Sequence, residues 1–170
     1  MSTRCLYGFK KDGKIKLMYN HSDSYPSGFG QRIVLFIREN TIEELNEICN
    51  KIRLVNRKEL PTDKDISEMI EKNIYYKRDD RILNWENIFW INDTFLQYYK
   101  ENFFCIPDFS DWLDGLEDYL YIINLDTNKF EVYKMRLSND EKDANDEYEK
   151  YKLLRNFDLD NIPKNWELII

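Results

Sequence analysis

Apolar and polar residues alternate along two short stretches near the N-terminus, residues 3–9 and 15–19, which Asp12-Gly13 separates. Alternation with a period of two is typical of a strand that buries one face, and Asp-Gly is a favoured two-residue hairpin turn. The pattern therefore predicts a β-hairpin. Within it, Gly8 marks a bulge or a close approach of two backbones.

Apolar residues change to helical spacing further along the chain. The five consecutive apolar residues 33–37 suit a buried strand or a helix, and a helix over residues 30–39 is preferred because glycines precede it and arginines flank it. Thr41 and Glu44 have the spacing of a capping box, and helical spacing of apolar residues then continues to Val55.

The middle of the chain is rich in aromatic residues. Leu60-Pro61 ends the preceding helix, and Thr62 begins a shorter one. Three short helices are expected over residues 84–90, 92–100 and 109–115. Because few basic residues are interleaved with the aromatic ones, we interpret the aromatic side chains as core and not as a stacking surface for bases.

The C-terminal third returns to strand patterns. Residues 117–125 are apolar on both faces, which predicts a central strand, and turn-forming residues 126–129 lead into a second strand at Phe130. The charged segment 138–152 is expected to be a solvated helix. The tail, residues 166–170, has the composition of a strand docked on the sheet.

Strands at both ends with helices between them are typical of an α+β domain. We therefore expect the N-terminal and C-terminal β-hairpins to share one mainly antiparallel sheet, with the intervening helices packed on it. A chain of 170 residues with 42% hydrophobic residues is long enough for a core, so a single domain over residues 1–170 is the simplest organisation.

The net charge of −7 limits the classes of partner that the chain is expected to bind. An acidic chain repels nucleic-acid phosphates and anionic membranes, so no direct nucleic-acid or membrane partner is expected. The three cysteines, Cys5, Cys49 and Cys105, are far apart and predict reduced thiols in a bacterial cytoplasm. No ligand spacing indicates a metal, and no cofactor is expected.

Polar chemistry concentrates in the segment that follows the first hairpin, residues 19–30, which holds the only histidine. His21 and Asp23 are the candidate catalytic residues, because a carboxylate beside an imidazole suits acid–base chemistry. A triad with a loop serine is conceivable, but geometry decides it. Asp and Ser are also ordinary turn formers.

Two further features of this segment suit a ligand. Gly28-Phe29-Gly30 precedes a helix, where backbone N–H groups can hold an anion with Arg32 nearby. Arg4 either recognises a ligand or pairs with Asp23 or Glu117.

Five segments of the chain belong together: Thr3-Arg4, Asp12-Gly13, the loop from Tyr19 to Gly30, Tyr121-Ile122-Ile123-Asn124-Leu125-Asp126 and Phe130-Glu131-Val132-Tyr133. They resemble a widespread group of hypothetical proteins that is frequent in bacteriophages, prophages and bacteria and has relatives in fungi. The match covers both hairpins and leaves residues 40–115 unmatched. The resemblance implies one shared constellation of Thr3, Arg4, Asp23, Pro26, Gly28 and Gly30, and it brings no assigned activity. Relatives can carry Gln at the position of His21, which argues against an obligatory base there.

These observations favour a small binding protein for a small polar or nucleotide-like ligand, and the resemblance implies that it is phage- or prophage-encoded, with a role in counter-defence. One alternative is a hydrolase or transferase that uses His21 and Asp23. The other is an acidic inhibitor of a host nucleic-acid enzyme, which contacts that protein through residues 138–152. Binding is preferred over catalysis, and the oligomeric state is left open. The candidate ligand-binding residues are Thr3, Arg4, Asn20, His21, Asp23, Ser24, Tyr25, Ser27, Gly28 and Gly30.

Overall fold

The structure is a computed structural model that describes residues 3–91, 95–115, 117–137 and 147–170. The chain divides into two compact units, of which the first joins Met1–Cys49 to Phe109–Ile170 and the second is Asn50–Asp108. A single domain over residues 1–170 stays a prediction.

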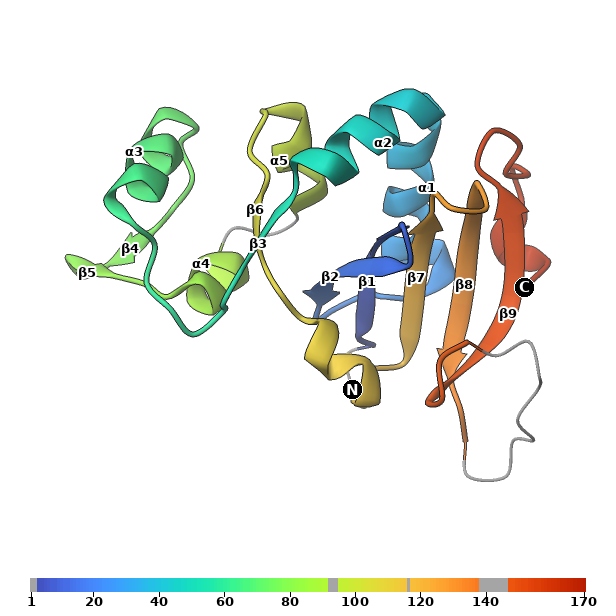
Figure 1. Cartoon of the computed structure of the whole chain (residues 1–170). Helices are drawn as coiled ribbons and strands as arrows, with labels where there is room; N and C mark the ends of the chain where they lie inside the picture. The colour runs from blue at the N-terminus through green and yellow to red at the C-terminus, as the bar shows by residue number, and fades with distance from the viewer. Residues whose placement is uncertain (1–2, 92–94, 116, 138–146) are drawn as a thin grey trace. The chain divides into compact units, whose positions relative to one another are not determined.

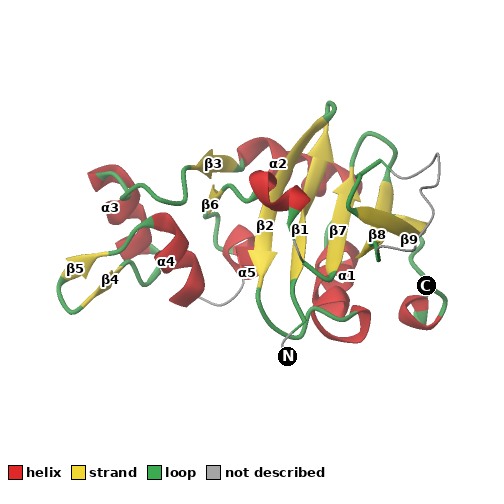
Figure 2. Ribbon diagram, turned by 90° about the horizontal axis from the view of Figure 1, so that it is seen from below, coloured by secondary structure: helices red, strands yellow, loops and turns green. Residues whose placement is uncertain are grey.

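Unit 1 is built on a five-stranded sheet in the order β2-β1-β7-β8-β9, with helices beside it (Figures 1 and 2). Neighbouring strands are antiparallel except β1 and β7, which run parallel and join the two predicted hairpins. The protein is therefore α+β, and both hairpins lie in one mainly antiparallel sheet, as predicted. The strands are β1 (Cys5–Lys11), β2 (Lys14–Asn20), β7 (Tyr119–Asn124), β8 (Lys129–Met135) and β9 (Tyr151–Asp158).

The first hairpin turns at Asp12 and Gly13, whose φ angles of 51° and 68° suit the predicted tight turn. At Gly8 the backbones of β1 and β2 approach closely. A Cβ atom built there would lie 1.9 Å from the carbonyl oxygen of Lys16. The position therefore needs glycine, which confirms the predicted close approach.

The helices that follow also match their sequence signals. The preference for a helix over a strand is confirmed by α1 (Gln31–Arg38), and α1 packs Phe36 edge-on against Phe9 of the sheet, with the ring centres 6.5 Å apart. The next helix, α2 (Ile42–Lys51), begins with the predicted capping box. In it Glu44 accepts from the Thr41 N–H and Thr41 accepts from the Glu44 N–H.

The helix predicted to continue to Val55 ends at Lys51, and that part of the prediction is wrong. Residues Arg53–Val55 form β3, which pairs in parallel with β6 (Cys105–Pro107). The Arg53 N–H donates to the Phe104 carbonyl at 2.8 Å. A hydrogen-bond partner about fifty residues away overrides the local helical spacing, which no window of local sequence reveals.

Two C-terminal predictions are corrected. Residues 138–146 of the expected charged helix lie outside the described residues, and the described remainder is a turn that leads into β9. A register shift against β8 at Val132/Tyr133 hides the alternation of β9 in the sequence.

The expected tail strand is instead a short 3₁₀ turn, η3 (Trp166–Leu168), because the Trp166 side chain is fully buried and anchors the tail by packing.

Unit 2 holds α3 (Asp63–Glu71), the small hairpin β4 (Lys77–Arg78) and β5 (Arg81–Ile82), α4 (Trp85–Ile91), α5 (Phe95–Lys100) and the β3–β6 pair. Its buried aromatic residues include Trp85, Tyr99 and Phe103, as expected of a core. The third predicted short helix is the 3₁₀ turn η2 (Ser110–Asp114) of unit 1. None of the helices described is long and apolar enough to cross a membrane.

Candidate functional site

The predicted loop joins β2 to α1 through an irregular helical turn, η1 (Pro26–Gly30). Hydrogen bonds between buried polar groups hold it against the sheet. Ser24 is fully buried, and its hydroxyl accepts a hydrogen bond from the Asn20 side-chain amide at 2.7 Å. Its carbonyl accepts from the Tyr121 hydroxyl of β7 at 2.8 Å. The Ser24 N–H donates to the Thr3 carbonyl at 3.4 Å. The loop is therefore fastened to two strands of the sheet.

The backbone of the loop explains the spacing of its aspartate and glycine. Asp23 has a φ of 50°, in the left-handed region, and its carbonyl accepts from the Phe29 N–H at 2.8 Å. This bond brings the Asp23 carbonyl to 2.4 Å from where a Cβ of Gly28 would lie. Asp is among the few residues besides glycine that visit this conformation readily, so the motif meets a folding requirement.

The N–H groups of the predicted anion cradle are engaged within the loop. Those of Gly28 and Gly30 donate to the Tyr25 carbonyl at 2.9 and 3.1 Å, and that of Phe29 donates to Asp23. What this turn presents to a ligand is therefore its side chains.

The structure divides the predicted ligand-binding residues that carry side chains into two sets, while Gly28 is half-buried and Gly30 is buried. Thr3, Asn20 and Ser24 are buried and form the frame. The second set is exposed and consists of Arg4, His21, Asp23, Tyr25 and Ser27. Tyr25 is 49% exposed, so part of its ring and its hydroxyl can be reached from solvent.

Arg4 was expected either to recognise a ligand or to pair with Asp23 or Glu117. In the structure it makes a hydrogen bond with Tyr19: burial raises the pKa of Tyr19, and the charge of Arg4 and this hydrogen bond act in the opposite direction. The Arg4 N–H donates to Asp118 at 2.9 Å. Arg4 is thus tied to the strand ends beside the loop.

The acid–base hypothesis needs a bond between His21 and Asp23. Within the described part of the chain, the Asp23 carboxylate makes no hydrogen bond to His21 or to a loop serine. A triad therefore stays a hypothesis without a contact to support it.

The Cys5 thiol beneath the loop is fully buried, and burial raises its pKa, which keeps it protonated and unreactive. All three cysteines are free, as expected of reduced thiols, and all three are buried.

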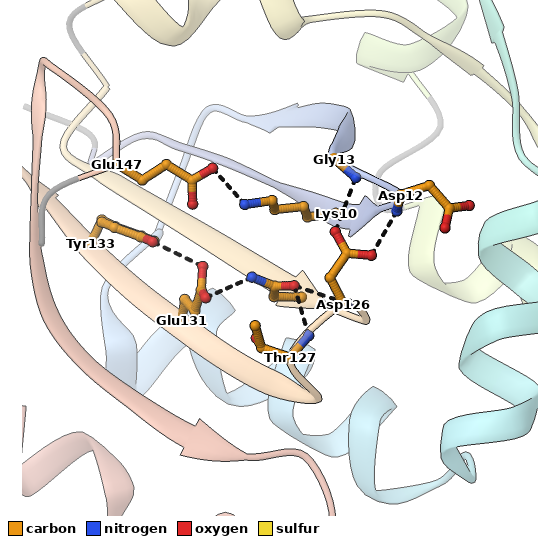
Figure 3. A network of polar contacts seen from close by, with 9 residues as sticks. Lys10, Asp12, Gly13, Asp126, Thr127, Glu131, Tyr133 and Glu147 are labelled. Atoms are coloured by element: carbon orange, nitrogen blue, oxygen red, sulfur yellow. Dashed lines mark hydrogen bonds and ion pairs between the residues drawn. The ribbon is translucent and has the colours of Figure 1, made fainter.

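A second polar cluster, which the sequence analysis missed, lies at the other end of the sheet (Figure 3). The nearly buried Glu131 carboxylate accepts from the Asn124 amide and from the Tyr133 hydroxyl, both at 2.8 Å. Asn124 in turn accepts from the backbone of Asp126 and Thr127. A glutamate between the apolar Phe130 and Val132 was the available signal.

This cluster holds the tips of the two hairpins together. The Asp126 carboxylate accepts from the N–H groups of Asp12 and Gly13 at 2.6 and 3.0 Å. Lys10 pairs with Glu147 at 2.5 Å beside it. Since the polar atoms of Asn124, Glu131 and Asp126 are used on neighbouring backbone and side chains, we interpret the cluster as structural.

Asp126 gives the protein a specific dependence on pH. The N–H groups of Gly13 and Asp12 hold the pKa of Asp126 below its usual value of 3.8. Its contribution to stability is therefore present above that usual pKa and is lost as pH falls through the lowered one. Asp126→Asn is expected to reduce the free energy of unfolding at pH 7 by about 1 kcal/mol, a figure discounted for exposure.

The measurement is urea unfolding of both proteins between neutral and strongly acidic pH. The difference between them should vanish in acid, and a difference that is constant over the whole range contradicts the assignment. Asp12→Asn is the control, because Asp12 donates to Asp126 through its backbone alone.

Comparisons with known proteins were made for the whole chain. No family model matches it, and neither a curated protein nor a solved structure matches it. Among the described residues, no group of three or more His, Cys, Asp or Glu side chains is arranged to hold a metal ion.

Proposed function

We propose that the protein binds a small polar, nucleotide-like ligand on the loop between β2 and α1. The observation that carries this proposal is the contrast between the loop's buried frame and its exposed side chains. Ser24 and Asn20 are fixed by buried hydrogen bonds, while His21, Asp23 and Tyr25 are open to solvent. A loop that is ordered before binding loses less conformational entropy when a ligand arrives.

Each exposed group suits a part of such a ligand. The Asp23 carboxylate accepts from ribose hydroxyls or from base N–H groups, and the Tyr25 ring offers a face on which a base can stack. His21 and Ser27 add hydrogen-bonding groups on the same segment. The left-handed backbone at Asp23 is held by the bond from the Phe29 N–H, so the backbone that carries the carboxylate is ordered before a ligand arrives.

The resemblance to phage and prophage proteins adds a biological role to the proposal. A protein of that kind that holds a nucleotide in a bacterial cytoplasm would sequester a host signalling molecule and so modulate host defence. The alternative of an acidic inhibitor depends on residues 138–152, of which 138–146 lie outside the described residues.

Asp23→Asn tests the proposal with little change to the backbone, since Asn also tolerates the left-handed conformation. Native mass spectrometry is made of the protein as purified and after incubation with a mixture of nucleoside mono-, di- and triphosphates. We expect a bound small mass in the wild type and at least about a tenfold loss of it in Asp23→Asn, as for a charged hydrogen bond.

Asp12→Asn is the matched control, because Asp12 is another exposed aspartate of unit 1 with a φ of 51°. It should retain the bound mass. An empty wild-type spectrum, or equal occupancy in Asp23→Asn, would overturn the loop as the ligand site.

A further inference from the structure

Unit 2 carries a cavity that the proposed function does not use. It has a volume of about 370 Å³, and its walls come from the hairpin β4–β5, from Lys58 and Leu60, and from Asn84 and Asn87 at the start of α4. Two backbone bonds fasten these walls together: the Trp85 N–H donates to the Glu59 carbonyl, and the Glu86 N–H donates to the Arg57 carbonyl. The volume is within the range of small-molecule sites.

Three cationic side chains line this cavity, from Lys58, Arg78 and Arg81. Within the described part of the chain, none of their head groups takes part in an ion pair or a side-chain hydrogen bond. The neighbouring carboxylates are engaged elsewhere: Glu59 accepts from Asn56 at 3.1 Å, and Asp80 pairs with Lys77 at 3.8 Å.

Asp79 is the one acidic residue among the cavity's lining residues, which leaves an excess of two positive charges there. This excess occurs in a chain whose net charge is −7.

The hairpin places two of these cations against each other. Arg78 and Arg81 are direct cross-strand partners, because the two-residue turn at Asp79 and Asp80, with φ angles of 50° and 60°, fixes the register. Like charges in directly opposite positions destabilise a strand pair. A hairpin of two residues per strand gains nothing from this repulsion, whereas an anion between the guanidinium groups removes it.

We propose that this cavity binds the phosphate groups of a small phosphate-bearing ligand. The two guanidinium groups offer forked donors to phosphate oxygens, and Lys58, which lines the same cavity, adds a third positive charge. Asn84 and Asn87 offer amides, and the exposed side chains of Leu60 and Ile82 offer apolar contact to the organic part. This site lies in unit 2 and is independent of the loop proposed above.

The test is isothermal titration of the full chain with inorganic pyrophosphate, at low salt and again at physiological salt. We expect saturable binding, at least about tenfold weaker in the double variant Arg78→Gln/Arg81→Gln. Lys77→Gln is the matched control: Lys77 is a cation of the same hairpin that is paired with Asp80 and is not among the residues lining this cavity. It should bind within twofold of the wild type.

Lys58→Gln is the second variant, because it leaves the hairpin untouched and should also weaken binding severalfold. Without ligand, the double variant should melt no lower than the wild type, since the mutation removes a repulsion. Asp23→Asn should bind pyrophosphate normally, which separates this proposal from the loop site.

Three results would overturn the proposal: no binding by the wild type, undiminished binding by the double variant, or equal weakening in Lys77→Gln, which indicates diffuse attraction only. Binding of a hexaglutamate peptide without binding of pyrophosphate would also overturn it, in favour of an acidic protein partner.

Discussion

Gly8→Ala is expected to reduce the free energy of unfolding by more than about 3 kcal/mol. The added methyl group would lie 1.9 Å from the Lys16 carbonyl oxygen and 2.9 Å from its carbon. Both are backbone atoms, so the clash is relieved only by moving β1 from β2. Because β1 also pairs with β7, that movement disturbs the middle of the sheet.

Urea unfolding of the two proteins measures this loss. Gly13→Asn is the control, because Gly13 has a φ of 68° with nothing within 4 Å of its Cβ position, and Asn tolerates that conformation. We expect it to change stability by less than about 1 kcal/mol. A Gly8→Ala protein as stable as Gly13→Asn would show that the two strands are not in close approach.

Trp166→Ala is expected to lower the free energy of unfolding by about 3–5 kcal/mol, the range for a buried aromatic side chain. The indole is fully buried and meets the rings of Phe130 and Phe157 edge-on, with ring centres 5.5 and 6.1 Å apart. It also lies against Gly30, where a Cβ would be 3.0 Å from an indole carbon. Its removal therefore leaves a cavity beneath the start of α1.

Trp166→Phe separates packing from hydrogen bonding. The indole N–H is buried and has no acceptor among the described residues, so its loss leaves no acceptor unpaired there. We expect Trp166→Phe to cost about 1–2 kcal/mol, well below the alanine variant, by thermal or urea unfolding. Equal losses in the two variants would mean that the indole N–H has a partner.

The elements with local signals were predictable from the sequence. The hairpin at Asp12-Gly13, the capping boxes at Thr41 and Thr62 and the doubly apolar β7 each depend on residues within a few positions of one another. The elements that depend on distant partners were not. β3 exists because β6 pairs with it, and β9 is hidden by a register shift in its pairing with β8.

The position of the candidate site was predictable from the sequence, but which of its residues are buried and which are exposed was not. The sequence placed Asn20, Ser24 and Asp23 together, and nothing in it distinguishes the buried Ser24 from the exposed Asp23. That difference comes from the Tyr121 hydroxyl, almost a hundred positions away. The cations of unit 2 were missed for a similar reason, since Lys58 meets the hairpin only in the folded chain.

The parallel pairing of β1 with β7 has a consequence for synthesis. The Arg4 N–H finds its acceptor on Asp118, 114 positions later, and the ladder from Cys5 to Lys10 depends on the same distant segment. At about 5–20 residues per second, a ribosome makes the first hairpin roughly 5–20 s before its partner strand exists. During that interval one edge of β1 is open, while unit 2, whose residues are contiguous, can already complete its own contacts. The nascent chain is thus most exposed to wrong strand pairing at its beginning, and a chaperone that covers residues 5–11 would protect it there.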